Sequence, residues 1–139
     1  MPMMAVPAPP AAIDREECLQ LLAGAAVGRV VFTALAMPAA QPVAFLVDGD
    51  EIVFRASGPI GAARKDVVAF EADNIDPNTL TGWSVLGVGE AYEVRDPARL
   101  ARLTGLPLTV LETASPQSTV IAIRLRNLTG QRVHPAEPG

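Results

Sequence analysis

Residues 41–55 read QPVAFLVDGDEIVFR. Two runs rich in Val, Ile and Phe flank the Asp-Gly-Asp at 48–50, and this composition is typical of two strands joined by a tight turn. The segment therefore predicts an antiparallel hairpin with strands at Gln41–Val47 and Glu51–Arg55.

The period-two pattern extends along the chain on both sides of this hairpin. It predicts four more strands, at Arg29–Ala34, Asp66–Asp73, Trp83–Val94 and Thr119–Leu125. Because these strands follow one another without long helical crossovers, we expect a mainly β fold, a six-stranded antiparallel barrel with short helices. Gly87 and Gly89 share one face of the long fifth strand, which indicates a bend or the close approach of another backbone.

Short helices and turns are expected between the strands. Asp14 and Glu17 have capping-box spacing, which predicts a helix from Arg15 to about Ala25 with Cys18 on its apolar stripe. Asp96 is expected to cap a helix at Pro97–Leu103. We expect a loop containing Pro38 after Ala34, and a final turn at 129–132.

The length of 139 residues suits one domain, which we place at residues 14–133. Residues 1–13 are expected to form a flexible N-terminal arm and residues 134–139 a C-terminal tail. Half of the residues are hydrophobic and 19% are charged, so disorder over the whole chain is excluded. No apolar run is long enough to span a membrane.

The charge balance argues against nucleic acid as a partner. Eleven basic residues face 15 acidic ones, for a net charge of −4, and Lys65 is the only lysine. Cys18 is the only cysteine, so no intrachain disulfide can form and a cytoplasmic location is expected. One cysteine and one histidine also make a structural zinc site improbable. We expect no metal site, although Glu71, Asp73 and Asp76 leave a divalent-cation site as a minor alternative to a solvated edge.

The residues carry no familiar hydrolase, zinc-protease or phosphate-loop signature. The stretch from Phe54 to Gly58 is more informative, because Arg55 ends a strand and a turn of small residues follows at once. Such a turn presents backbone N–H groups, a hydroxyl and a guanidinium together, which suits a phosphate. A surface arginine beside a turn is the alternative interpretation.

Six stretches, in this order, resemble the pyridoxamine 5′-phosphate oxidase-like proteins. They are Gly28–Phe32, Pro42–Gly49, Ile52–Arg55, Val68–Asp73, Thr81–Val85 with Gly89, and Thr129–Arg132. The resemblance implies a split β-barrel that pairs as a homodimer. Members commonly bind FMN in a cleft at the dimer interface, and relatives bind the deazaflavin F420 or haem.

The resemblance also assigns cofactor-binding positions. These are Pro42, Val43 and Ala44 along the isoalloxazine ring, Arg55, Ala56 and Ser57 at the phosphate, and Trp83 and Ser84 in the cleft. The family's phosphate lysine is absent at residue 60, and Arg64 or Lys65, a few residues on, is the replacement cation that we expect, with Lys65 taken as the supporting contact. A second argument favours the homodimer. Apolar strand faces, such as the face that carries Val85 and Gly87, would be exposed to solvent in a monomer.

Four positions depart from the family pattern. Ala44 stands where Asn is usual, Ala56 where Thr is usual, Ile60 where Lys is usual, and Gln131 where the first arginine of a Thr-Gly-Arg-Arg ending is usual. Two hypotheses follow. The first is an FMN- or F420-dependent oxidoreductase acting on a small-molecule substrate. The second is a non-catalytic ligand-binding or scaffold dimer of the same fold with a degenerate flavin pocket.

Overall fold

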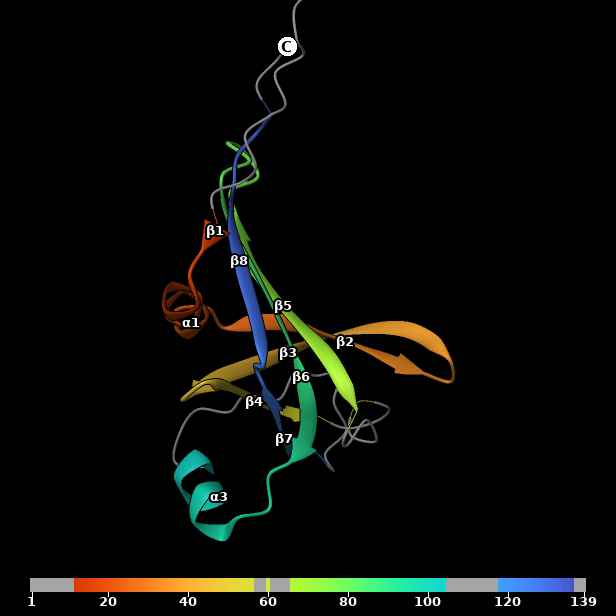
Figure 1. The fold of residues 1–139 in the computed structure, drawn as a ribbon. Coiled ribbons are helices and arrows are strands. Elements are labelled where there is room, and N and C mark those ends of the chain that lie inside the picture. The colour runs from red at the N-terminus through yellow and green to blue at the C-terminus, as the bar shows by residue number, and fades with distance from the viewer. Residues whose placement is uncertain (1–11, 57–59, 61–65, 105–117, 137–139) are drawn as a thin grey trace, which may run out of the picture.

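The computed structural model describes residues 12–56, 60, 66–104 and 118–136. Strands account for most of them (Figure 1). In chain order the elements are β1 Ala12–Ile13, α1 Arg15–Ala23, β2 Val27–Ala34, β3 Met37–Asp48, β4 Glu51–Ala56, β5 Val67–Ile75, β6 Gly82–Glu93, α3 Pro97–Thr104, β7 Thr119–Arg124 and β8 Asn127–Val133.

The strands form a closed antiparallel barrel. The sheet order is β1-β8-β6-β5-β2-β3-β4-β7, and β6 also pairs with β7. That second pairing joins the two ends of the run from β6 to β7, so six strands close on one another. These six are the strands predicted from the sequence, and β8 and β1 extend the sheet beyond the barrel through β6.

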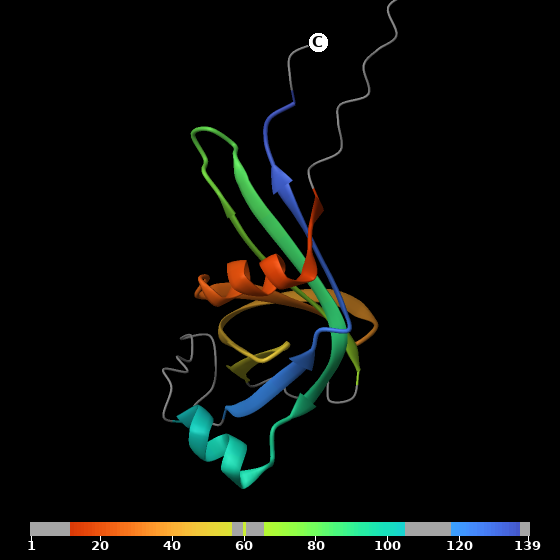
Figure 2. The same ribbon diagram turned by 60° about the vertical axis from the view of Figure 1, so that its left-hand side comes forward.

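Strand β6 joins both parts of the sheet because it bends. Its first part pairs with β8 from Gly82 to Val88, and its last three residues pair with β7 (Figure 2). At Gly89, an added Cβ would lie 1.4 Å from the carbonyl oxygen of Arg124. The predicted close approach of another backbone is therefore confirmed at this glycine.

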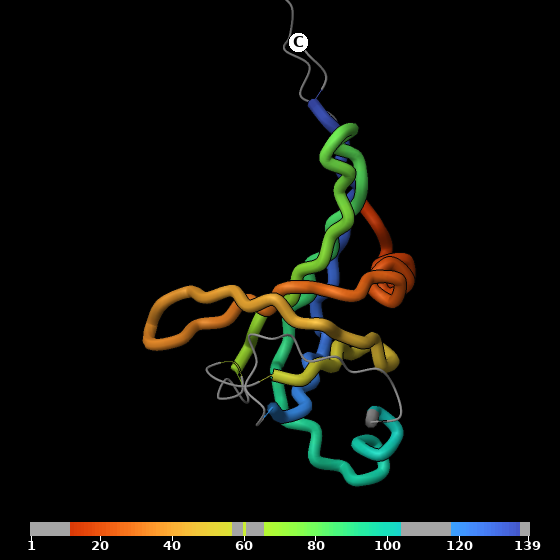
Figure 3. The backbone as a smooth tube through the Cα atoms, turned by 180° about the vertical axis from the view of Figure 1, so that it is seen from behind, coloured from red at the N-terminus to blue at the C-terminus, as the bar shows by residue number. Residues whose placement is uncertain are grey.

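The expected loop around Pro38 is instead part of a long hairpin. Strand β3 begins at Met37, and the pairing runs from Ala34 with Met37 to Val27 with Ala44. Only Leu35 and Ala36 connect the strands, and both have a positive φ. The prediction of a loop was wrong because a two-residue turn lies between β2 and β3, where the sequence carries no glycine. The hairpin projects from the barrel (Figure 3).

The expected turn at 129–132 was also wrong. These residues lie within β8, where Ser84 pairs with Gln131 and Leu86 with Thr129. Gly130 is in extended pairing with Val85, because a glycine there leaves room for the sulfur of Cys18 on α1. On its other edge β8 pairs with Ala12 and Ile13, the last two residues of the expected N-terminal arm.

The core fills the barrel and the space beneath α1. Phe54, Phe70 and Leu22 are fully buried in it. Val85 and Gly87 are both buried within the single chain, Val85 at 0% exposed. The prediction that their strand face would be exposed in a monomer was therefore wrong, and it gives no argument for a dimer. The large apolar side chains that remain exposed on the sheet include Val27, Val31 and Leu86.

Helices α1 and α3 begin at the predicted caps. The Glu17 N–H donates to Asp14 Oδ1 over 2.8 Å, and the Arg99 N–H donates to Asp96 Oδ2 over 3.0 Å. Cys18 is buried on the inner face of α1, as expected for a small core residue. No helix among the described residues is long and apolar enough to cross a membrane.

An ionic cluster attaches α3 to the β3–β4 hairpin. Arg99 donates to Asp48 over 3.0 Å, to Glu51 over 2.8 Å and to the hydroxyl of Tyr92 over 2.6 Å. Arg102 makes a two-armed contact with Asp48 at 2.9 and 3.0 Å. These charge-assisted contacts fix the helix to the barrel, beside a second apolar cluster in which Leu103 of α3 packs with Val53 and Val120.

Candidate functional site

The outer face of the sheet collects several of the predicted cofactor-binding residues. On β3, Pro42 and Ala44 point outward on either side of Val43, which is 2% exposed. Strand pairing places Pro42 beside Arg29 and Arg29 beside Glu71. Ser84 is on the same face, because it pairs with Asp73, which lies two residues along β5 from Glu71.

Three charged side chains occupy the middle of this face. Arg29 lies 3.2 Å from Glu71 and 3.8 Å from Asp73, nitrogen to carboxylate oxygen. Burial, and after it the neighbouring Asp73 carboxyl, raise the pKa of Glu71 to about 7 against the lowering effect of Arg29. Glu71 can therefore exchange a proton near neutral pH.

Two hollows flank this charged group. One is a cavity of about 290 Å³ lined by Glu71, Ser84, Leu86, Thr129, Gly130 and Gln131. The other, of about 480 Å³, lies between the end of α1 and the β5–β6 hairpin and is lined by residues that include Val27, Asp73 and Trp83. Trp83 and Ser84, adjacent in sequence, thus line different hollows because they point to opposite sides of β6.

Arg55 lies elsewhere, on β4, where it pairs with Val120 of β7. It is half-buried. Every other arginine that the structure describes forms an ion pair with a carboxylate, and Arg55 alone among them does not. Its guanidinium is therefore left with unused hydrogen-bonding capacity next to the predicted phosphate turn.

Several predicted positions near Arg55 carry apolar, buried side chains. Val43, Ala56 and Ile60 belong to the same core cluster, and Ala56 and Ile60 are 0% and 1% exposed. Because these side chains are apolar, the three residues could donate or accept hydrogen bonds with a ligand only through their backbone N–H and C=O groups. Ser57 and Lys65, the remaining predicted phosphate contacts, lie outside the described residues.

The chain thus holds two separate groups of predicted residues. Pro42, Ala44 and Ser84 share the outer sheet face, whereas Arg55 and Ala56 lie on β4 in the other part of the barrel. Sequence reasoning named Glu71 and Asp73 only as a solvated edge or minor metal alternative, and it assigned no role to Arg29. The alternation of acids at Glu71 and Asp73 on β5 indicates that both carboxylates share one strand face. That Arg29 lies opposite them follows only from the register of β2 with β5, which the sequence does not show.

Asp76 does not join this group. Its carboxylate accepts from the Asn78 N–H over 2.7 Å and shapes the turn between β5 and β6. Among the residues that the structure describes, no three potential metal ligands come together.

The comparisons with known proteins agree with this fold. Residues 14–132 match the family model described as pyridoxamine 5′-phosphate oxidase. The uncharacterized protein Rv0080 of Mycobacterium tuberculosis is 40% identical over 129 residues, covering 87% of this chain and 84% of that protein.

Solved structures show the same similarity. The FAD binding protein from Mycobacterium smegmatis is 31% identical with a TM-score of 0.74, and the match covers 89% of this chain and 98% of that one. The conserved protein of unknown function DIP1874 from Corynebacterium diphtheriae is 28% identical with a TM-score of 0.74, covering 91% and 99%.

Proposed function

The chain belongs to the pyridoxamine 5′-phosphate oxidase family, and we propose that it binds a flavin nucleotide within this fold. The similar structure from Mycobacterium smegmatis is that of an FAD binding protein. FMN and FAD share the isoalloxazine ring and the ribityl phosphate, so one set of residues can serve either. FMN is the smaller ligand that carries both groups, and F420 and haem are the alternatives.

The guanidinium of Arg55, which forms no ion pair with a carboxylate in the described part of the chain, is the observation that carries this proposal. A half-buried arginine without a carboxylate partner is costly unless another anion approaches it. A phosphate ester meets that need, because the planar guanidinium donates two parallel hydrogen bonds to phosphate oxygens. Ser57 and Gly58 lie outside the described residues, and the turn that their sequence predicts would supply further N–H donors.

The separation of the two residue groups points to a site shared by two protomers. Arg55 would bind the phosphate on one protomer, while the outer sheet face of the other would wall the ring. The small side chains Pro42 and Ala44 leave space for a flat ring system on that face. In this proposal the homodimer completes the binding site.

The proposed activity is an oxidoreductase reaction on a small molecule. A bound flavin supplies the redox chemistry, and the protein supplies position and electrostatics. Glu71 would hold or accept a proton on the sheet face near neutral pH, and Arg29 would favour its ionised form.

A degenerate pocket is the second candidate, and the burial of Ala56 and Ile60 favours it. Both side chains stand where the family pattern has polar groups, and both pack in the core. In that case the protein would be a ligand-binding or scaffold dimer that has lost its flavin.

Binding of FMN and of riboflavin to Arg55→Ala distinguishes these candidates. We expect Arg55→Ala to weaken FMN binding by about 1.5–3 kcal/mol, roughly ten- to a hundredfold, because a charge-assisted contact is lost. Riboflavin, which has no phosphate, should bind equally to both proteins. The matched control is Arg95→Ala, which removes a 73%-exposed arginine outside the site. Equal losses for both ligands, or no FMN binding by the parent protein, would overturn the proposal.

A further inference from the structure

The β2–β3 hairpin carries an uncharged, apolar tip into solvent. No charged residue occurs between Arg29 and Asp48, in a chain of which 19% of the residues are charged. The hairpin projects from the barrel (Figure 3), and at its tip Leu35 is 99% exposed and Met37 is 67% exposed. Protruding strands of a protein that stays monomeric normally carry charges, so an apolar tip indicates contact with another surface.

The free edge of this hairpin is closed to an added strand. Strand β3 pairs with β4 only at Phe45–Asp48, so its edge over residues 37–44 has no strand beside it among the described residues. Pro38 and Pro42 lie in this part of β3. Because a proline has no N–H for the ladder with β2, its nitrogen faces the free edge and removes a donor that a further strand would need. A partner would therefore meet the side chains of the tip.

The hollow between α1 and the β5–β6 hairpin is lined mainly by apolar side chains. Its volume is about 480 Å³, and its lining includes Leu21, Ala26, Val27 and Trp83. Asp73 is the one charged residue of the lining within the described part of the chain. Trp83 packs against the core, whereas Val27 is 50% exposed. This hollow can therefore receive apolar side chains from another molecule.

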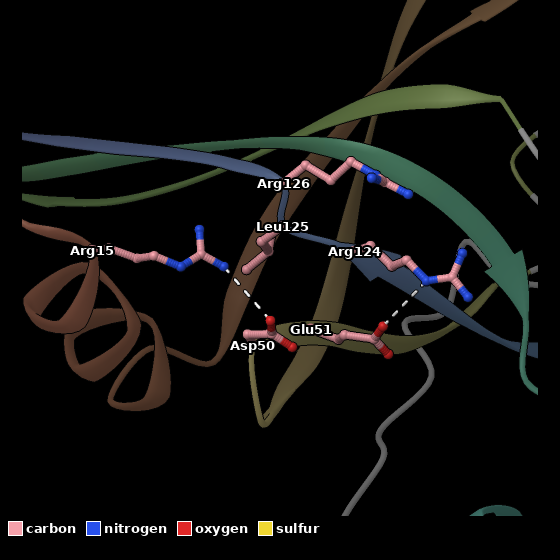
Figure 4. Close-up of a pocket in the computed structure, with 6 residues that line it drawn as sticks. All are labelled: Arg15, Asp50, Glu51, Arg124, Leu125 and Arg126. Atoms are coloured by element: carbon pink, nitrogen blue, oxygen red, sulfur yellow. Dashed lines mark ion pairs between the residues drawn. The ribbon is translucent and has the colours of Figure 1, made fainter.

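A second hollow, of about 490 Å³ beside the β3–β4 turn, has a different character. Arg15 forms an ion pair with Asp50 in its lining, and Arg124 forms one with Glu51 (Figure 4). An uncharged tip seated there would take these groups out of water without offering side-chain hydrogen bonds in return, which is unfavourable. The hollow beside α1 is therefore the better match for the β2–β3 tip.

Strand β2 places this hollow and the tip at opposite ends of one segment. Val27 begins the strand and lines the hollow, and Leu35 follows the last residue of the strand. Val31 lies midway, four residues after Val27 and four before Leu35, and is 40% exposed on the outer sheet face. A two-fold axis that passes through this face at Val31 reverses the direction of β2, and so brings the tip of each copy to the hollow of the other.

We propose that the β2–β3 tip of one protomer docks in the hollow beside α1 of a second copy, and that the contact is reciprocal. The inference rests on the homodimer proposed above and names the contact that holds it. Leu35 and Met37 would bury their apolar surface against Val27 and Trp83, twice in each dimer. This contact also gives a reason for a leucine at φ +52°, where the turn alone would favour Gly or Asn.

Cross-linking of cysteine variants tests this geometry. Leu35→Cys combined with Ala26→Cys should give a covalent dimer with a bismaleimide that spans about 10 Å, the spacing of packed sheets. The two positions lie at opposite ends of β2, so the reagent cannot join them within one chain. Each single variant should stay uncoupled, as should Leu35→Cys combined with Asp50→Cys, which marks the charged hollow. Cys18 is buried and should not react.

The Kd of the dimer, measured by analytical ultracentrifugation, gives the energetic test. Leu35→Asn should raise it at least about tenfold, because two apolar contacts are lost in each dimer. Asparagine tolerates the left-handed backbone of the turn, so weaker association would not come from misfolding. Leu35→Met is the matched control, since it keeps an apolar side chain of similar size and should leave the Kd within about twofold.

The outcomes separate this contact from the proposals on which it rests. A dimer that forms without the cross-link between residues 26 and 35, or whose Kd is the same in Leu35→Asn as in the parent protein, would overturn the docking of the tip and leave the homodimer standing. A parent protein that stays monomeric would overturn both the docking and the homodimer. Flavin binding is measured independently by titration, so its failure would not be confused with either result.

Discussion

At the scale of single residues, the charges around Glu71 determine the protonation state of its carboxyl on the outer sheet face. The carboxyl is only 25% exposed and has an acid and a base as neighbours. Desolvation and Asp73 favour its protonated form, and Arg29 favours its ionised form. Because the first two dominate, the folded chain holds a proton on Glu71 at pH values where the unfolded chain has released it.

This difference in proton affinity makes stability depend on pH. The pKa of Glu71 is about 7 in the folded chain, against an ordinary value of 4.5. Its contribution is therefore complete below pH 4.5, decreases as the pH rises to 7, and is constant above that. The total loss is about 2 kcal/mol after allowance for solvent screening of the partly exposed carboxyl.

Glu71→Gln should remove most of this pH dependence, since glutamine has the same shape and does not titrate. Urea unfolding of both proteins at several pH values between 4.5 and 8 measures it. We expect the variant to be the more stable of the two at pH 8 and their stabilities to converge at the acidic end. Parallel curves over the whole range would show that Glu71 titrates normally.

At the scale of elements, the β2–β3 turn places two successive non-glycine residues in the left-handed backbone region. Leu35 has φ +52° and Ala36 has φ +62°, values that side chains other than Gly, Asn and Asp seldom adopt. The side chain of Leu35 is also 99% exposed, so it gains nothing from burial within the protomer. The turn is therefore held by the long ladder of β2 and β3 rather than by its own residues.

The double variant Leu35→Asn with Ala36→Gly should relieve this strain. We expect a stabilisation of about 1–2 kcal/mol, which raises the Tm by several degrees, because Asn-Gly suits a two-residue hairpin turn. Leu35→Ala is the control, since it removes the exposed side chain but keeps the unfavourable backbone. A thermal melt of the three proteins measures the effect, and a double variant that melts no higher than the control would contradict it.

The elements themselves divide into those that local patterns specify and those that they do not. All six barrel strands and both helix caps could be predicted, because alternation and capping are local properties. Strand β8 could not, since Thr129-Gly130 has the composition of a turn and becomes a strand only through pairing with β6. The continuous β3 was missed because a turn without glycine gives no local signal.

The candidate site was less predictable than the fold, for the same reason. The position of Arg55 at a strand end is a local feature, but its lack of a partner depends on where every carboxylate lies. The contact of Arg29 with Glu71 joins residues far apart in sequence through the β2–β5 register. The burial of Ile60 likewise depends on how the core is filled.

At the scale of the whole molecule, the outer sheet face is the surface on which a second copy would pack. Val31 and Leu86 are exposed to 40% and 44% on this face, which also carries Pro42 and Ala44. We expect a C2 dimer that buries more than about 2,000 Å² in total. Light scattering at micromolar concentration should give twice the chain mass.

Leu86→Glu probes this interface directly. A charge at this partly exposed position should shift the protein to the monomer without loss of its far-ultraviolet circular dichroism, because the side chain is not part of the core. Leu80→Glu is the control, a 53%-exposed leucine in the β5–β6 loop. A parent protein that is already monomeric, or a Leu86→Glu variant that stays dimeric, would contradict the proposed interface.

The central claim is that this barrel binds a flavin, and an equilibrium titration of the purified protein with FMN and with FAD tests it most directly. Quenching of flavin fluorescence together with a shift of the absorption band reports binding of either nucleotide. The account predicts saturation at one flavin per protomer, with a Kd in the micromolar range or below. A folded protein that binds neither nucleotide at concentrations of about 100 μM would contradict the claim and leave the degenerate pocket as the better description.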